Sequence, residues 1–138
     1  MKTGITTFFS ILIACSAFAQ TKDTLSEKLL VYQLPNGAWG KQLNDGKAVS
    51  YNLPLDKDLL KKIKSTGDEH ATIDNNATTR EINILVKTYK TSKNPAYLSA
   101  AEKGIKYLLS MQYENGGFPQ YYPISRSTAS RLLTMITR

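Results

Sequence analysis

The feature that most constrains the fold is a nine-residue pattern that occurs twice, at residues 33–41 and 112–120. Both copies begin with the glutamine of a Leu-Leu-x-x-Gln run and reach an Asn-Gly pair, with an aromatic residue two positions after the glycine. Glycine allows the positive φ that a tight turn requires. Two equivalent helix-to-turn junctions at long spacing predict repeated helical hairpins, as in a toroid or solenoid, where one unit cannot bury its own apolar face.

The aromatic residue of the pattern is Trp39 in the first copy and Phe118 in the second. Two interpretations are open for both rings. In one, each ring plugs the end of its helix, because aromatic side chains are commonly core residues. In the other, the turn presents the ring at the rim of a groove, where it forms a platform on which a sugar can stack.

The first two helices are predicted from hydrophobic spacing and from residues that start or stop helices. The first covers residues 25–33, with Ser26 as its N-cap. The second is a short amphipathic helix over residues 56–66, and Gly67 stops it.

The next two helices form a predicted hairpin. Thr78 and Glu81 have the spacing of a capping box at the start of a helix that runs to about Lys93. Asn94 then serves as N-cap, and Pro95 takes the first position of the following helix. We expect an all-α chain. The buried face of the last helix is expected to carry Leu98, Ala101, Ile105, Leu108 and Gln112.

The first nineteen residues have the pattern of a secretory signal peptide. A positive start and a short apolar run precede Ala17-Phe18-Ala19, which has the form of a cleavage site. We therefore expect a secreted or periplasmic protein. In a rival interpretation, Cys15 is the lipid-anchored residue of a lipoprotein. Because Cys15 is the only cysteine, it forms no disulfide within the chain.

The net charge of the whole chain, +7, overstates the basicity of the predicted folded part. Residues 20–123 carry fourteen Lys and Arg against eleven Asp and Glu, a net charge of +3. Such a surface is compatible with an anionic polymer and with an ordinary mixed surface. Export argues against a nucleic-acid partner, and nothing implies a stable protein partner.

The most specific segment is residues 71–81, which read Ala-Thr-Ile-Asp-Asn-Asn-Ala-Thr-Thr-Arg-Glu. It resembles the Thr-Ile-Asp-Asn-x-Ala-Thr segment of the pectate lyases of polysaccharide lyase family 10. The start of the first turn, the junction at residues 86–97 and the Leu-Leu-x-x-Gln-Tyr-x-Asn-Gly-Gly run at 108–122 are also similar to that family. The resemblance covers about residues 25–123. It departs where Phe118 replaces a frequent tryptophan and where Ala38-Trp39-Gly40 replaces the usual Gly-Trp-Pro.

The resemblance implies part of an α/α toroid that cleaves polygalacturonate or pectin by β-elimination with Ca²⁺. Loss of the C5 proton is easier when the neighbouring carboxylate is neutralised by Ca²⁺ and cationic side chains. Asp74 is implied as a calcium- or substrate-side acid; a second cap for the following helix is the alternative. Arg80 could meet a uronate or pair with a nearby acid. The implied substrate-binding residues are Trp39, Arg80, Phe118 and Tyr121.

The resemblance stops after Pro123, and residues 124–138 are predicted to be an out-of-frame tail. In a back-translation with suitably chosen codons, one added cytosine recovers the family's Ile-Thr-Tyr-Asn-Asp segment. A natural short form with an unrelated tail is the rival interpretation. We expect residues 20–123 to be a partial catalytic domain.

The family's second aspartate and its arginine base belong to later helices. We therefore expect no catalytic residue within this chain and negligible activity from it alone. A non-catalytic uronan-binding module and a helical interaction protein are the alternative functions. In a partial ring, we expect exposed or poorly packed side chains at Leu85, Tyr89, Leu108 and Leu109.

Overall fold

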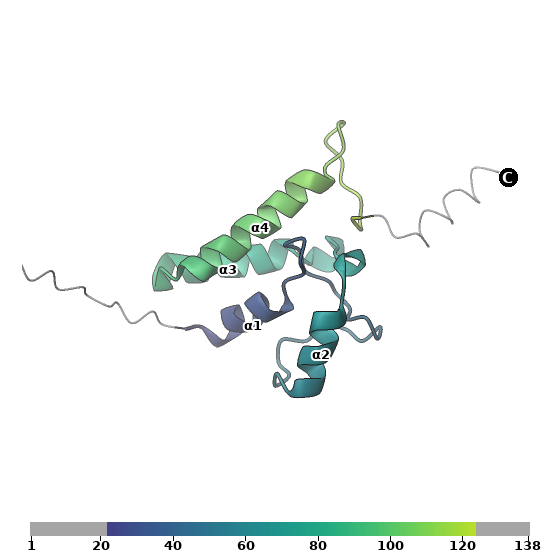
Figure 1. Ribbon diagram of the computed structural model, residues 1–138. Helices are drawn as coiled ribbons and strands as arrows, with labels where there is room; N and C mark the ends of the chain where they lie inside the picture. Colours follow the sequence, from purple (N-terminus) through teal and green to yellow (C-terminus); the bar gives the residue numbers. More distant parts are fainter. Residues whose placement is uncertain (1–21, 124–138) are drawn as a thin grey trace, which may run out of the picture.

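The computed structural model describes residues 22–123, and the predicted signal peptide and tail lie outside this part (Figure 1). The described part contains four α-helices and two short 3₁₀ turns, η1 and η2. Their bounds are α1 Thr24–Tyr32, α2 Lys57–Ser65, η1 Asp68–His70, η2 Asp74–Asn76, α3 Thr79–Ser92 and α4 Pro95–Met111. In this part of the chain, extended pairing is limited to isolated bridges between single residues. The predicted all-α class is confirmed.

Side-chain caps fix the starts of three helices. Asp56 caps α2 by accepting from the Leu59 N–H at 2.8 Å, and Asn94 caps α4 by accepting from the Ala96 N–H at 3.0 Å. The predicted N-cap of α1 is wrong. Asp23 caps this helix, accepting from the Ser26 N–H at 2.8 Å. Ser26 is fully buried inside the first turn, where its hydroxyl donates to Thr88 on α3.

The α3–α4 hairpin is confirmed. The two helices lie side by side (Figure 1), and Lys93 closes α3 in the left-handed conformation, with φ 55°. The predicted face of α4 is confirmed at Ala101, which is fully buried, and at Leu108, which packs against the core. It is wrong at Ile105, which is 43% exposed, and at Gln112, which is also exposed. The buried residues of α4 are Tyr97, Ala100, Ala101, Gly104, Tyr107 and Met111.

Small residues explain the register of α4. A Cβ on Gly104 would lie 2.7 Å from Cγ1 of Ile82 on α3 and 3.0 Å from the Trp39 ring, so glycine permits the close approach. A prediction from apolar spacing places the large apolar side chains on the buried face. In this structure the two helices pack closely, so alanine and glycine occupy much of that face.

The main core lies between α1, α3 and α4. It includes Leu29 of α1, Leu85 of α3 and Tyr97 of α4, each with no exposed surface. The expectation that Leu85 is poorly packed is therefore wrong, whereas Leu109 is 67% exposed as expected. No helix of residues 22–123 has the length and hydrophobicity needed to cross a membrane.

Candidate functional site around Asp74

The two Asn-Gly turns have the same local hydrogen bonds, as their repeated sequence predicts. In the first turn, the Leu34 N–H donates to the Ala38 carbonyl at 2.9 Å, and in the second Tyr113 donates to Gly117 at 2.8 Å. The glutamine before each turn donates to the carbonyl of the turn glycine, at 2.8 and 3.1 Å. The glycines themselves have φ of 92° and 82°. The shape of each turn is therefore set by hydrogen bonds among its own residues.

The first turn is packed inside the protein. Trp39 is 1% exposed, and its indole N–H donates to the Leu29 carbonyl of α1 at 2.9 Å. The proposal that Trp39 forms a sugar-stacking platform is therefore corrected, because both faces of its ring are enclosed by the core. Of the two interpretations left open, the helix-end plug describes its position. Phe118, in contrast, is 46% exposed.

The segments that follow the two turns lie on either side of residues 71–73. An antiparallel bridge pairs Gly40 with Ala71, and another pairs Thr72 with Tyr121. The Ile73 N–H donates to the Gln120 carbonyl at 3.1 Å. Gly40 and Tyr121, which are 81 positions apart, are thus brought to one short segment, and Asp74 follows directly after it.

Asp74 begins η2, and its carboxylate forms an ion pair with the ammonium of Lys41. The side chains are 23% and 32% exposed, so the pair lies at the surface and is accessible to a ligand. The hydrogen bond from Lys41 lowers the pKa of Asp74, and a weaker contribution comes from the side chain of Gln120. The same pairing raises the pKa of Lys41. Both side chains are therefore charged at neutral pH.

An aromatic ring completes this group. The Lys41 ammonium lies 5.8 Å from the centre of the Tyr121 ring, which is partly exposed. We call Lys41, Asp74, Gln120 and Tyr121 the Asp74 cluster. The structure thus brings together two of the residues predicted from the sequence, Asp74 and Tyr121. The alternative role of Asp74 as a helix cap does not describe its carboxylate, which faces Lys41.

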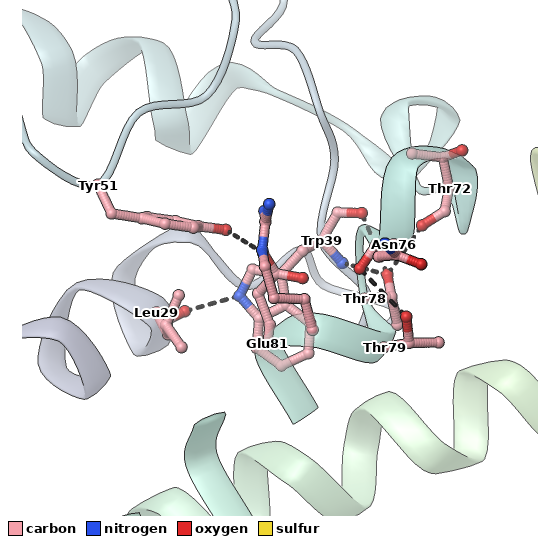
Figure 2. A network of polar contacts seen from close by, with 9 residues as sticks. Leu29, Trp39, Tyr51, Thr72, Asn76, Thr78, Thr79 and Glu81 are labelled. Atoms are coloured by element: carbon pink, nitrogen blue, oxygen red, sulfur yellow. Dashed lines mark hydrogen bonds and ion pairs between the residues drawn. The ribbon is translucent and has the colours of Figure 1, made fainter. Parts of the chain in front are cut away.

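Arg80 belongs to a different polar group, on the first turn of α3. Two other members of this group, Tyr51 and Glu81, are labelled in Figure 2. Its Nε donates to Oε1 of the fully buried Glu81 at 3.0 Å, and the Tyr51 hydroxyl donates to the same oxygen at 2.9 Å. The other oxygen, Oε2, has no hydrogen-bond partner. The side chain of Arg80 is 52% exposed. Of its two open roles, Arg80 therefore forms the ion pair while it still presents its guanidinium to solvent.

The predicted capping box at the start of α3 is wrong. Thr78 occupies the N-cap position but forms no cap hydrogen bond with its side chain. Glu81 does not reach back to the helix start, because its carboxylate is taken up by Arg80 and Tyr51. The spacing of Thr78 and Glu81 could not reveal this arrangement. The partner of Glu81 is Tyr51, and the partner of Thr78 is Trp39 in the first Asn-Gly turn, so both come from distant parts of the sequence.

Sequence reasoning missed Lys41 and Gln120. A signal for both was present, since each takes the last position of one copy of the repeated pattern. The two positions meet at Asp74, because the segments after both turns flank residues 71–73. Repeat position therefore identifies these residues where single-residue chemistry does not.

A calcium ion takes about six to eight oxygen ligands. Asp74 supplies a carboxylate of suitable chemistry, but residues 22–123 contain no group of three or more His, Cys, Asp or Glu side chains placed to hold a metal ion. The oxygen chemistry of Asp74 therefore fits calcium, and the described residues provide only part of a ligand set.

Known proteins with similar sequence and structure identify the family of this chain. The family profile described as Pectic acid lyase matches residues 33–135. This range extends past Pro123, and the boundary of the predicted tail stays a prediction. No curated protein sequence matches the chain.

Two solved structures are similar to this chain. One is family 10 polysaccharide lyase from Cellvibrio cellulosa, at 32% identity, and the other is an aspartate-to-alanine mutant of such a lyase from the same organism in complex with trigalacturonic acid, at 31%. Each has a TM-score of 0.58 and covers 74% of this chain, which spans 28% of the lyase's length. The predicted part of an α/α toroid is thus confirmed. Because the family profile covers well over half of the residues, this chain belongs to the pectic acid lyase family and is a relative of the family 10 polysaccharide lyases.

Proposed function

We propose that this chain carries part of the active site of a pectate lyase, which cleaves polygalacturonate by β-elimination. The observation that carries the proposal is the Asp74 cluster, in which a carboxylate and an ammonium lie together at the surface beside an aromatic ring. The family membership supports it, and so does the similar lyase structure with bound trigalacturonic acid.

The reaction removes the C5 proton of a galacturonate residue and expels the O4 leaving group. The C5 proton becomes more acidic when positive charge neutralises the neighbouring carboxylate, because the carbanion-like transition state places negative charge there. The Lys41 ammonium is our candidate for this role, because it is charged and lies 5.8 Å from the centre of the partly exposed Tyr121 ring. Tyr121 offers an apolar face to the sugar, and the exposed ring of Phe118 offers another.

Calcium is a further part of the proposal. Asp74 would hold the ion together with ligands from outside the described residues. A bound calcium ion would supply a second positive charge for the uronate carboxylate. When the substrate binds, the Lys41 ammonium would leave its ion pair with Asp74 and pair with a carboxylate of the substrate.

Arg80 is a second candidate for contact with a uronate. Its guanidinium is held by the buried Glu81 on one side, while 52% of the side chain is exposed. A guanidinium anchored in this way keeps donors free for a planar carboxylate. We propose that Trp39 supports the site from the core and makes no contact with the polymer.

We further propose that the protein is exported, as the predicted signal peptide implies. The resemblance assigns the second aspartate and the arginine base to later helices. The chain of 138 residues should therefore bind oligogalacturonate and form little unsaturated product. Exported proteins of this type would act on pectin outside the cytoplasm.

The test is calorimetric titration of the chain with oligogalacturonate, together with an absorbance assay for the unsaturated product of β-elimination. Lys41→Met should weaken binding by about tenfold, in line with the loss of a charged hydrogen bond. The matched control is Lys62→Met, which breaks the surface pair with Asp45 at 2.9 Å and should leave binding unchanged.

If both lysine variants lost the same amount of affinity, the loss would be due to the change in net charge. That result would contradict a specific site at Lys41. Absence of binding by the unaltered chain would contradict the proposed function. Calcium-dependent cleavage by the chain alone would show that it needs no further catalytic residues. Binding that survives Lys41→Met and disappears in Phe118→Ala would favour the alternative function, a uronan-binding module.

A further inference from the structure

The loop that carries Asp74 has an unusual backbone. Asn75 and Asn76 have φ of 53° and 61°, and Thr78 has φ of 68° with ψ of −53°. Asparagine tolerates positive φ, but a β-branched residue there is a strong outlier. Such a conformation persists only when the surroundings hold it, and it is often found near functional sites. Thr78 is therefore at this position for a reason other than backbone preference.

The hydroxyl of Thr78 supplies that reason. The side chain is fully buried, and its oxygen accepts from the Trp39 N–H at 3.0 Å. The same hydroxyl can donate to the Thr72 carbonyl at 3.0 Å or to the Trp39 carbonyl at 3.2 Å (Figure 2). One side chain thus links the chain after the first turn, the central segment before Asp74 and the start of α3.

The two linked residues have a common relation to the Asp74 cluster. Trp39 lies two residues before Lys41, and Thr72 lies two residues before Asp74. The Thr72 N–H also points to the Trp39 carbonyl, at a long 3.4 Å, and the Asp74 N–H donates to the Thr72 hydroxyl at 3.0 Å. The Thr78 hydroxyl therefore reinforces a weak connection between the two segments that carry the ion pair.

We propose that Thr78 is a positioning residue, whose buried hydroxyl sets the spacing between Lys41 and Asp74. Its functional meaning rests on the proposed function, whereas its structural role does not. The backbone strain and the missing helix cap follow from this role, because the hydroxyl that would cap α3 is turned instead toward Trp39 and Thr72.

Three substitutions separate the hydroxyl from the shape and the backbone strain. Thr78→Val keeps the shape and removes the hydroxyl, and Thr78→Ser keeps the hydroxyl. Thr78→Gly removes the hydroxyl and also the strain of positive φ, so this variant remains informative if the valine variant does not fold.

Thr66→Val is the matched control in a different loop. Thr66 is 5% exposed, and its hydroxyl donates to the Lys62 carbonyl at 2.8 Å and accepts from the Asn44 N–H at 3.1 Å. The Thr66→Val variant therefore loses a comparable pair of hydrogen bonds, but at a position away from the Asp74 cluster.

The experiment measures amide hydrogen exchange by NMR in the full chain, at the amides of Trp39, Thr72, Ile73 and Asp74, relative to amides of α4. Thr78→Val and Thr78→Gly should accelerate local exchange by about tenfold, the equivalent of one buried hydrogen bond. Thr78→Ser should restore protection, and Thr66→Val should leave the ratio to α4 unchanged. Protection that survives Thr78→Gly, or a ratio that changes equally in Thr66→Val, would overturn the proposal.

The second measurement is the affinity for oligogalacturonate in the same variants. It should fall in Thr78→Val and Thr78→Gly, recover in Thr78→Ser and stay unchanged in Thr66→Val. If the exchange results hold while the unaltered chain binds no oligogalacturonate, the proposed function fails and the structural role of Thr78 stands. If the unaltered chain binds and the Thr78 variants bind equally well, Thr78 does not position the site.

Discussion

The two Asn-Gly turns are alike in sequence and hydrogen bonding but differ in what surrounds them. In the first, a Cβ on Gly37 would lie 2.6 Å from the Lys103 carbonyl of α4, so a helix lies directly against the turn. In the second, the nearest atom to a Cβ on Gly116 is Nε2 of Gln112, at 4.0 Å. The ring that follows is buried in the first turn and 46% exposed in the second.

This difference shows that the conformation of the turn does not determine whether its aromatic residue is buried. The turn closes through hydrogen bonds between residues at most four positions apart, so it forms in either environment. The ring becomes a core residue only where other helices enclose it. The same motif can therefore hold the core together at one position and offer a surface at another.

The largest effect should come from the two aromatic residues. Trp39→Ala should lower the free energy of unfolding by about 3–5 kcal/mol, because it empties a large buried site. Phe118→Ala should lower it by less than about 1 kcal/mol, because nearly half of that ring is already in water. Urea unfolding of both variants measures the difference. Equal losses would show that the second ring is also part of a core.

The turn glycines should give the next largest effect. Gly37→Ala combines the cost of positive φ with a clash against Lys103, and about 3 kcal/mol of stability should be lost. Gly116→Ala meets only the cost of positive φ, about 1 kcal/mol. The check is the midpoint of urea unfolding at constant slope. If Gly116→Ala were as damaging as Gly37→Ala, the second turn would be packed against another part of the protein.

The glutamines before the turns should differ less. Gln33 donates to the carbonyls of both Gly37 and Ala100, each at 2.8 Å, whereas the exposed Gln112 donates to Gly116 at 3.1 Å. Gln33→Ala should cost about 1–2 kcal/mol, since it leaves carbonyls unpaired in the interior. Gln112→Ala should cost less than about 0.5 kcal/mol. Thermal unfolding of the pair tests this, and a reversed order would contradict the comparison.

The last effect appears only at alkaline pH and concerns Tyr107, which joins α4 to the segment after the second turn by donating to the Tyr122 carbonyl at 2.9 Å. Burial raises the pKa of Tyr107 to about 12. Above the ordinary tyrosine pKa of about 10, the unfolded chain loses this proton and the folded chain keeps it. The stability that Tyr107 contributes is therefore complete below pH 10 and is lost as the pH rises toward 12.

The measurement for Tyr107 is the free energy of unfolding as a function of alkaline pH. The slope due to this residue cannot exceed about 1.4 kcal/mol per pH unit. Tyr107→Phe serves as the matched variant, since it removes the titrating hydroxyl and keeps the ring. A slope that is unchanged in this variant would assign the alkaline loss to other tyrosines.

Much of the site could not be predicted, and particular residues show why. Asp74 and Tyr121 were identified through the resemblance to the lyase family, and the structure places the two in one cluster. Lys41 was missed because its partner lies thirty-three positions away. Thr78 was read as a cap because its spacing to Glu81 fits one, whereas its hydroxyl is turned to Trp39, thirty-nine positions away.

What the sequence determined by itself is the local structure: the all-α class, the α3–α4 hairpin with its Asn94 cap, and the two turns with glycine at positive φ. Each of these depends on bonds between near neighbours in the chain, which residue types encode directly. Only the tertiary structure decided that Trp39 is core, that Phe118 is surface and that Lys41 meets Asp74. Burial and pairing over long separations depend on which helices pack together, and glycine and alanine on α4 settle that contact.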